Sequence, residues 1–185
     1  SGSKSDKKLA DLNREIDAFV QFIRNRKENL ISLGNKISWK YEEKFLPATY
    51  IKKQTIHVNE NVALLNHRDV LRLFGYSKGH HQRAVWRIDK SHEMVWFPKL
   101  YSNSDWVNSF DEESGYICQY RKDLKPHSLP SKDEGSRIVF AHQKNIFGQT
   151  VYKFYGVFRT DFSKSDPTYH YFERIEKTIS LSKYR

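Results

Sequence analysis

The sequence has few or none of the features that define membrane-spanning, secreted, disulfide-bonded or zinc-binding proteins. It has 185 residues, one cysteine (Cys118) and one methionine. No stretch approaches the ~18 consecutive apolar residues that span a bilayer, and no segment resembles a secretory leader. A single cysteine cannot form an internal disulfide and is too few for a cysteine-based zinc site. We therefore expect a cytoplasmic protein that makes no contact with a membrane.

Signatures of nucleotide chemistry and of hydrolases are also missing. The sequence contains neither GxGxxG nor GxxxxGK[ST], the glycine-rich loops that hold phosphates, and it lacks the GxSxG of α/β-hydrolases. No cofactor is expected. We favour a domain that is not an enzyme by itself, and the nuclease alternative is considered below.

Positive charge and aromatic rings are what the chain does have. Its 32 Lys and Arg against 22 Asp and Glu give a net charge of +10, and it carries 4 Trp, 11 Tyr and 12 Phe. A basic surplus with exposed rings is typical of nucleic-acid-binding domains. Because the surplus is spread along the chain, no basic tail accounts for it. DNA is the expected partner, and RNA stays open because such a surface serves both polymers.

Helical periodicity dominates the first part of the chain. Apolar residues recur at three- and four-residue steps over 5–33, which predicts one long helix. A second helix is predicted over 61–74, ended by Gly75. Between them lies the stretch 37–58, which contains Pro47, and there we expect a helical turn followed by a loop and a short strand at 55–58.

Short strands separated by polar turns are predicted for the rest. The runs are 84–88, 94–97, 115–120, 137–141 and 150–160. We also expect a hairpin loop at 145–148, a bulge or bend at Gly156 and a long loop over 122–136. The pattern predicts an α+β fold in which N-terminal helices pack on a curved antiparallel sheet or barrel. Residues 1–5 are set aside as a cloning remnant or disordered start, and 6–185 are expected to form one domain, helical over 6–75 and β-rich over 83–180.

The segment 76–83 is the first candidate for contact with nucleic acid. Its small residues allow close approach of the backbone, while its basic and hydrogen-bonding side chains suit phosphates. The predicted nucleic-acid-binding residues are Lys78, His80, His81, Gln82, Arg83, Arg87 and Lys99. Rings beside cations can stack on bases, and the candidates are Trp86, Trp96, Tyr101 and Trp106. We expect at least two of these three tryptophans to be structural.

Two alternatives come from the residues themselves. One is a small metal-dependent nuclease that uses histidines such as His67, His80 or His81, or carboxylates such as those at 89–93 and 111–113. Their spacing identifies none of them, and no metal site is predicted. The other is a protein-interaction module that dimerises through the long N-terminal helix.

The C-terminal third resembles the strand pattern of PUA-like barrel domains. The runs that carry the resemblance are 137–141, 152–158 and 171–175. This broad group includes SRA-like readers of modified bases attached to bacterial restriction enzymes. The resemblance implies a curved PUA-like barrel that accepts a flipped base in an aromatic-lined pocket. It also implies a recognition module of a restriction or defence protein. A further partner is expected to be either a second copy of the chain or a larger parent chain that carries a nuclease domain.

Overall fold

The computed structural model describes residues 11–27, 31–32, 46–79, 81–101, 105–145 and 148–184. They fall into two compact units, residues 1–43 and residues 44–185. In the first unit, residues 11–27 form an α-helix, and its apolar residues Leu12, Ile16, Phe19 and Ile23 are half or more exposed. The predicted first helix is thus confirmed over 11–27 and at 31–32, and the rest of it lies outside the described residues. None of the described helices is long and apolar enough to cross a membrane.

Short helices and strands open the second unit. In order they are α2 (Pro47–Lys53), β1 (Thr55–His57), η1 (Val58–Glu60), β2 (Ala63–Leu64) and α3 (His67–Arg72). Pro47 lies in the first turn of α2, where its missing N–H leaves no hydrogen bond unmade. The predicted strand at 55–58 is confirmed as β1, but only Gln54 separates it from α2, so the expected loop is absent.

The predicted helix over 61–74 was wrong in its first half. Ala63 and Leu64 pair with β8 instead. The helix begins only at His67 because Asn66 caps it, with the Asn66 side chain accepting a hydrogen bond of 2.9 Å from the backbone N–H of Asp69. Backbone pairing with the sheet therefore prevails over helical periodicity before Asn66.

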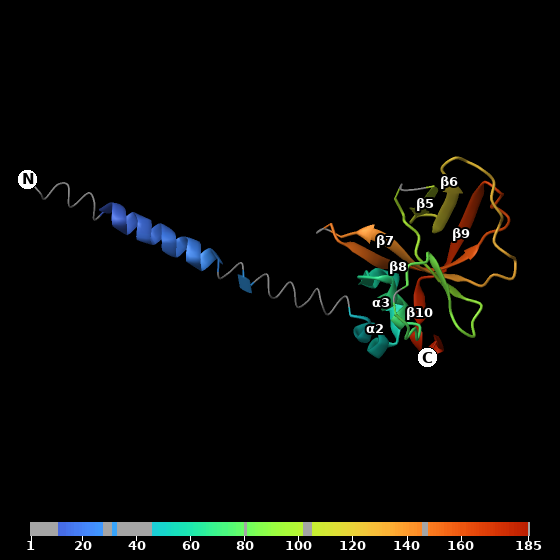
Figure 1. The fold of residues 1–185 in the computed structure, drawn as a ribbon, viewed down its shortest axis with the longest axis horizontal. Coiled ribbons are helices and arrows are strands. Elements are labelled where there is room, and N and C mark those ends of the chain that lie inside the picture. The colour runs from blue at the N-terminus through green and yellow to red at the C-terminus, as the bar shows by residue number, and fades with distance from the viewer. Residues whose placement is uncertain are drawn as a thin grey trace, which may run out of the picture. The chain divides into compact units, whose positions relative to one another are not determined.

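An open eight-stranded sheet forms the body of this unit (Figure 1). Its order is β3-β4-β7-β8-β9-β6-β5, with β2 paired to β8. The strands are β3 (Val85–Arg87), β4 (Met94–Trp96), β5 (Trp106–Asp111), β6 (Tyr116–Arg121), β7 (Arg137–Lys144), β8 (Thr150–Thr160) and β9 (Tyr169–Glu176). A separate pair joins β1 to β10 (Thr178–Ser180), and η2 (Leu181–Tyr184) follows. All five predicted strands are confirmed, whereas β5 was not predicted.

Two details of the sheet differ from the expectation of an antiparallel sheet or barrel. The sheet does not close, and β4 pairs with β7 in parallel. A parallel pair needs a long crossover, which β5, β6 and the predicted loop 122–136 supply. The predicted irregularity at Gly156 is present, since the register of β7 and β8 shifts beside it and its φ is +114°.

Two hydrophobic cores hold the sheet. In the first, residues of α2 and α3 such as Tyr50 and Leu71 pack with Phe140 and Phe154 of the sheet. The second core lies within the sheet's curve and includes Trp96, Ile117, Val139, Phe158 and Phe172. Figure 1 shows β5, β6 and β9 gathered at one end of the unit, away from the end that carries α2, β10 and the C-terminus. Each end carries a group of candidate residues.

Candidate nucleic-acid interface

A row of polar side chains crosses one face of β5, β6 and β9. Strand pairing sets Asn108 opposite Gln119, and Gln119 opposite His170. Side chains alternate between the two faces of a strand. The same face therefore also carries an apolar residue two positions away in each of the three strands. These are Phe110, Ile117 and Phe172, which belong to or pack on the second core. We call Asn108, Gln119 and His170 the polar row.

Hydrogen bonds fix two members of the polar row. The Nε2 of Gln119 donates to Oδ1 of Asn108 at 2.9 Å, and Nδ2 of Asn108 donates to the backbone oxygen of Lys99 at 3.3 Å. Asn108 is only 8% exposed and His170 only 2%. Amides held in this way have a defined direction, which is what reading a ligand's hydrogen-bonding edge requires.

The third member is coupled to a second histidine from the 122–136 loop. His127 Nε2 lies 3.1 Å from His170 Nδ1, and the two ring centroids are 3.8 Å apart. Burial first, and then the charges of His127 and Arg137, lower the pKa of His170 to about 4. His170 is therefore neutral at neutral pH. One of the two facing nitrogens must then donate and the other accept.

Three nitrogens around the row are buried and have no hydrogen-bond partner among the described residues. They are His127 Nδ1, His170 Nε2 and Arg137 Nε. In a pair of two neutral rings, if His127 donates to His170, then His170 Nε2 carries a proton and His127 Nδ1 accepts, and the opposite tautomers reverse both roles. The pair therefore offers one donor and one acceptor in either state. Buried polar groups without partners are rare in folded proteins, so such a cluster indicates a place that a ligand or water fills.

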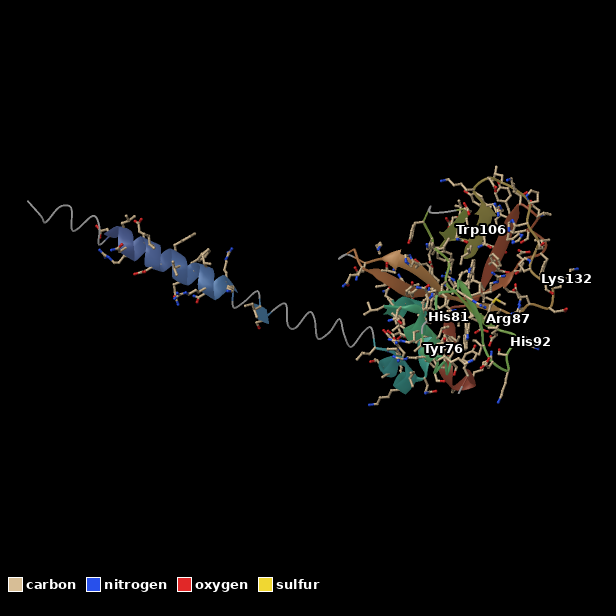
Figure 2. The ribbon with its side chains drawn as sticks, viewed as in Figure 1. Tyr76, His81, Arg87, His92, Trp106 and Lys132 are labelled. Atoms are coloured by element: carbon tan, nitrogen blue, oxygen red, sulfur yellow. The ribbon has the colours of Figure 1, made fainter. Side chains whose placement is uncertain are left out.

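Aromatic and cationic side chains surround the polar row. The ring of Trp106 meets that of His127 edge to face at 4.7 Å, and the Arg121 guanidinium lies 5.7 Å from the Trp106 ring. Trp106 is partly exposed, and Figure 2 shows it at the β5–β6 end of the unit. Lys99 and Tyr101 lead into β5, and the exposed Tyr101 hydroxyl contacts His142. Of the predicted residues, Lys99 belongs to this region through the contact of its backbone oxygen with Asn108, and Trp106 through its contact with His127, whereas Tyr101 contacts β7.

Trp96 is near the row but sealed inside the second core. It is 3% exposed, packs on Phe172 at 4.9 Å and has the Arg137 guanidinium 5.1 Å from its ring. The same guanidinium lies 4.5 Å from the Phe172 ring and pairs with Glu134 at 2.7 Å. A base would reach Trp96 only if Arg137 moved. In this arrangement Trp96 is a structural residue, in keeping with the expectation that most of the tryptophans are.

The other predicted residues lie around the segment 76–91, toward the α2 and α3 end (Figure 2). Lys78 and Trp86 line a pocket of about 580 Å³, and the ring of Trp86 meets that of Tyr76 edge to face at 5.6 Å. His81 and Gln82 line a smaller pocket of about 350 Å³ together with His67. Arg83 and Arg87 are exposed. His80 lies outside the described residues.

Several of the residues named for the nuclease alternative have structural partners. Asp111 accepts a hydrogen bond from Ser114 Oγ at 2.6 Å within the turn, and Glu112 pairs with Arg174 at 2.8 Å. His67 stacks on Phe97 with ring centroids 4.0 Å apart. In the part of the chain that the structure describes, no three His, Cys, Asp or Glu side chains are grouped as a metal site.

Sequence reasoning missed the centre of this region. Asn108, Gln119, His127 and His170 were not among the candidates. The available signal was a polar residue at an inward position of an otherwise aromatic strand, as in β5 and β6. That signal needs the strand pairing to be recognised, because β5 and β9 are far apart in the chain.

Comparison with known proteins assigns the domain. Residues 49–181 match the SRA family, the SET and RING associated domain. The chain belongs to the SRA domain family. The resemblance to SRA-like domains is thus confirmed. Domains of this family bind DNA, so DNA is the partner of this module, as charge and aromatic content predicted.

Two solved structures resemble this SRA domain. One is the 5-hydroxymethylcytosine-specific restriction enzyme AbaSI, with 27% identity and a TM-score of 0.67 over 93% of this chain and 56% of that chain. The other is the DNA recognition domain of the cytosine modification-dependent restriction endonuclease LpnPI, with 9% identity and a TM-score of 0.39 over 69% and 77% of the two chains. This chain therefore spans just over half the length of AbaSI. No curated protein matches it significantly.

Proposed function

We propose that this SRA domain reads a modified cytosine that has been turned out of duplex DNA and set against the polar row. The observation that carries the proposal is the buried set of hydrogen-bonding groups beside the partly exposed ring of Trp106. A protein that reads an extrahelical base needs both features, because hydrogen bonds identify the base edge and a ring stacks on its face. The resemblance to SRA-like readers supports the same assignment.

The chemistry of the row suits discrimination between related bases. Asn108 and Gln119 offer amide groups, and the histidine pair offers one donor and one acceptor. A site built to hydrogen-bond a substituent rejects an analogue that lacks it, since its own polar groups are then left buried and unpaired. A hydroxymethyl group on cytosine can both donate and accept, so it would suit the tautomeric pair. The name of AbaSI supports this choice of base.

Exposed cations would hold the DNA backbone. Arg83, Arg87 and Lys99 are exposed, and the charges of such side chains suit phosphate contacts that carry no sequence information. Phosphate contacts release counterions, so affinity should fall steeply with salt. We also propose that the domain acts inside the cell and within a longer parent chain that supplies the nuclease, because it spans only 56% of AbaSI.

A binding panel tests the proposal. The chain is titrated with otherwise identical duplexes whose single target cytosine is plain, 5-methylated or 5-hydroxymethylated. A preference of about tenfold or more for a modified duplex is expected, and Asn108→Ala should remove most of it. Ser109→Ala is the matched control, because Ser109 is exposed on the other face of the same strand. Equal affinity for all three duplexes would refute base reading.

The first unit supports a second candidate role, dimerisation. Leu12, Ile16, Phe19 and Ile23 follow the four-three-four spacing of a coiled-coil seam, and all four are half or more exposed on the 11–27 helix. Self-pairing would bury this seam. Sedimentation of the chain should then show a dimer that Ile16→Lys dissociates, whereas Arg14→Lys should leave it intact. A monomer at all concentrations would exclude this role.

A further inference from the structure

The pocket of about 580 Å³ is formed by residues outside the polar row and is not used by base reading. Three segments form it, namely residues 74–78 after α3, β3 with the turn that follows it, and η2. Its volume is in the range of pockets that hold ligands the size of a nucleotide. We call it the lysine pocket, after Lys78, Lys90 and Lys183 in its lining.

Aromatic rings make up much of its wall. Trp86, only partly buried, is held edge to face by Tyr76, and Tyr184 is held in the same way by Phe74 at 5.1 Å. The Tyr184 hydroxyl donates to Glu93 at 2.7 Å, which fixes that ring further. Rings held in place by their neighbours offer a preformed surface on which a planar group can stack, whatever its hydrogen-bonding pattern.

Cations converge on the pocket from each segment. Lys183 is neutralised by Glu93 at 2.9 Å. Lys78 and Lys90 form no ion pair among the described residues. The residues that line the pocket include one carboxylate, that of Asp89. Lys90 has a φ of +60°, a left-handed conformation that glycine or asparagine would adopt more readily. Because Lys78 and Lys90 both line the pocket without an ion pair to any described residue, the pocket carries an uncompensated positive charge.

We propose that the lysine pocket binds a nucleotide, with the base against Trp86 and the phosphate between Lys78 and Lys90. Asp89 can accept a hydrogen bond from the sugar hydroxyl. The combination of a ring surface with two unpaired cations distinguishes this site from a simple phosphate patch, which needs no ring, and from an apolar pocket, which needs no charge. The nucleotide comes either from solution or from a DNA strand that runs beyond the polar row.

Equilibrium dialysis of the full chain tests this proposal. The probes are deoxyguanosine 5′-monophosphate, deoxyguanosine, inorganic phosphate and a short single strand without modified cytosine. If the source is free nucleotide, the monophosphate should bind about tenfold or more tightly than the nucleoside or phosphate alone, because only it uses both halves of the site. If the source is DNA, the strand should bind and the monophosphate should not.

Substitutions in the lining test whether the bound probe, either the monophosphate or the strand, occupies the lysine pocket. The double change Lys78→Gln and Lys90→Gln, and separately Trp86→Leu, should each weaken the bound probe by about tenfold. Lys132→Gln with Lys177→Gln is the matched control, since it removes the same charge from exposed residues outside the pocket lining. Circular dichroism confirms that each variant is folded.

Two results would overturn the proposal. One is that neither the monophosphate nor the strand responds to the pocket variants more than to the control. The other is that phosphate alone binds as tightly as the monophosphate. Asn108→Ala separates this site from base reading, because it should abolish the preference for modified cytosine and leave nucleotide binding in the lysine pocket unchanged.

Discussion

The polar row and the segment 76–91 place polar side chains in opposite surroundings. In the row, Asn108 and His170 are almost wholly buried and their neighbours fix them. In the segment, Lys78, Arg83 and Arg87 are exposed. A buried polar group that lacks a hydrogen-bond partner costs free energy, whereas the interactions of exposed charges are screened by water and salt. The row therefore suits selectivity and the segment suits affinity.

Backbone substitutions should separate the packed sheet from the exposed segment most strongly. Gly156 has a φ of +114°, and a Cβ there would lie 2.6 Å from the backbone oxygen of Glu176. Gly156→Ala should lower the free energy of unfolding by about 2–4 kcal/mol, since strain and overpacking add. Gly79 in the exposed segment has nothing within 4 Å of the same position, so Gly79→Ala should change stability little. Denaturant unfolding measures both, and equal losses would contradict the contrast.

Lowering the pH should reduce the contribution of the polar row to the free energy of unfolding. The folded pKa of His170, about 4, is below its ordinary value of 6.5, so the unfolded chain takes up a proton first. The contribution of His170 to stability is complete above pH 6.5 and is lost as the pH falls toward 4. The free energy of unfolding should drop by up to about 3 kcal/mol across that interval. His170→Gln should flatten this dependence, and an unchanged slope would show that another group causes it.

Ring substitutions compare the two regions directly. Trp106 borders the polar row and Trp86 lines the lysine pocket. Trp106→Leu should weaken binding of a duplex with a modified cytosine by about 1–3 kcal/mol, the contribution of one stacked base. Trp86→Leu should leave the ratio between modified and plain duplexes unaltered. If Trp86→Leu alters that ratio and Trp106→Leu does not, the two sites have been assigned the wrong way round.

Exposed arginines should have the smallest effects. Arg83→Gln and Arg87→Gln should each weaken plain and modified duplexes alike, by about 1 kcal/mol or less at moderate salt. The slope of log affinity against log salt should become shallower by roughly one for each phosphate that the variant no longer binds. Binding titrations at several salt concentrations measure this slope. A change in the preference for modified cytosine would mean that these residues read the base.

Much of the fold could be predicted because its strands carry local signals. The runs that became β3, β4, β6, β7 and β8 are rich in β-branched and aromatic residues, and the irregularity at Gly156 follows from a glycine inside such a run. The pairing of β2 with β8, which replaces the first half of the predicted helix, and the parallel pairing of β4 with β7 depend on partners far along the chain. Periodicity does not report such partners.

The site was predicted only at its edges for the same reason. Trp106, Tyr101 and Lys99 are conspicuous as rings and charges, so composition finds them. Asn108, Gln119 and His170 acquire a role only when β6 pairs with both β5 and β9. Until that pairing is known, each looks like an ordinary polar residue in a strand.

The side-chain amide signals of Asn108 and Gln119 offer the most direct test of base reading. Nuclear magnetic resonance spectra would be recorded for the chain saturated with a plain duplex and then with the same duplex carrying one modified cytosine. The modified duplex should shift both amide signals, and the plain duplex should leave them near their free positions. If both duplexes saturate the chain and neither amide responds, the polar row does not read the base.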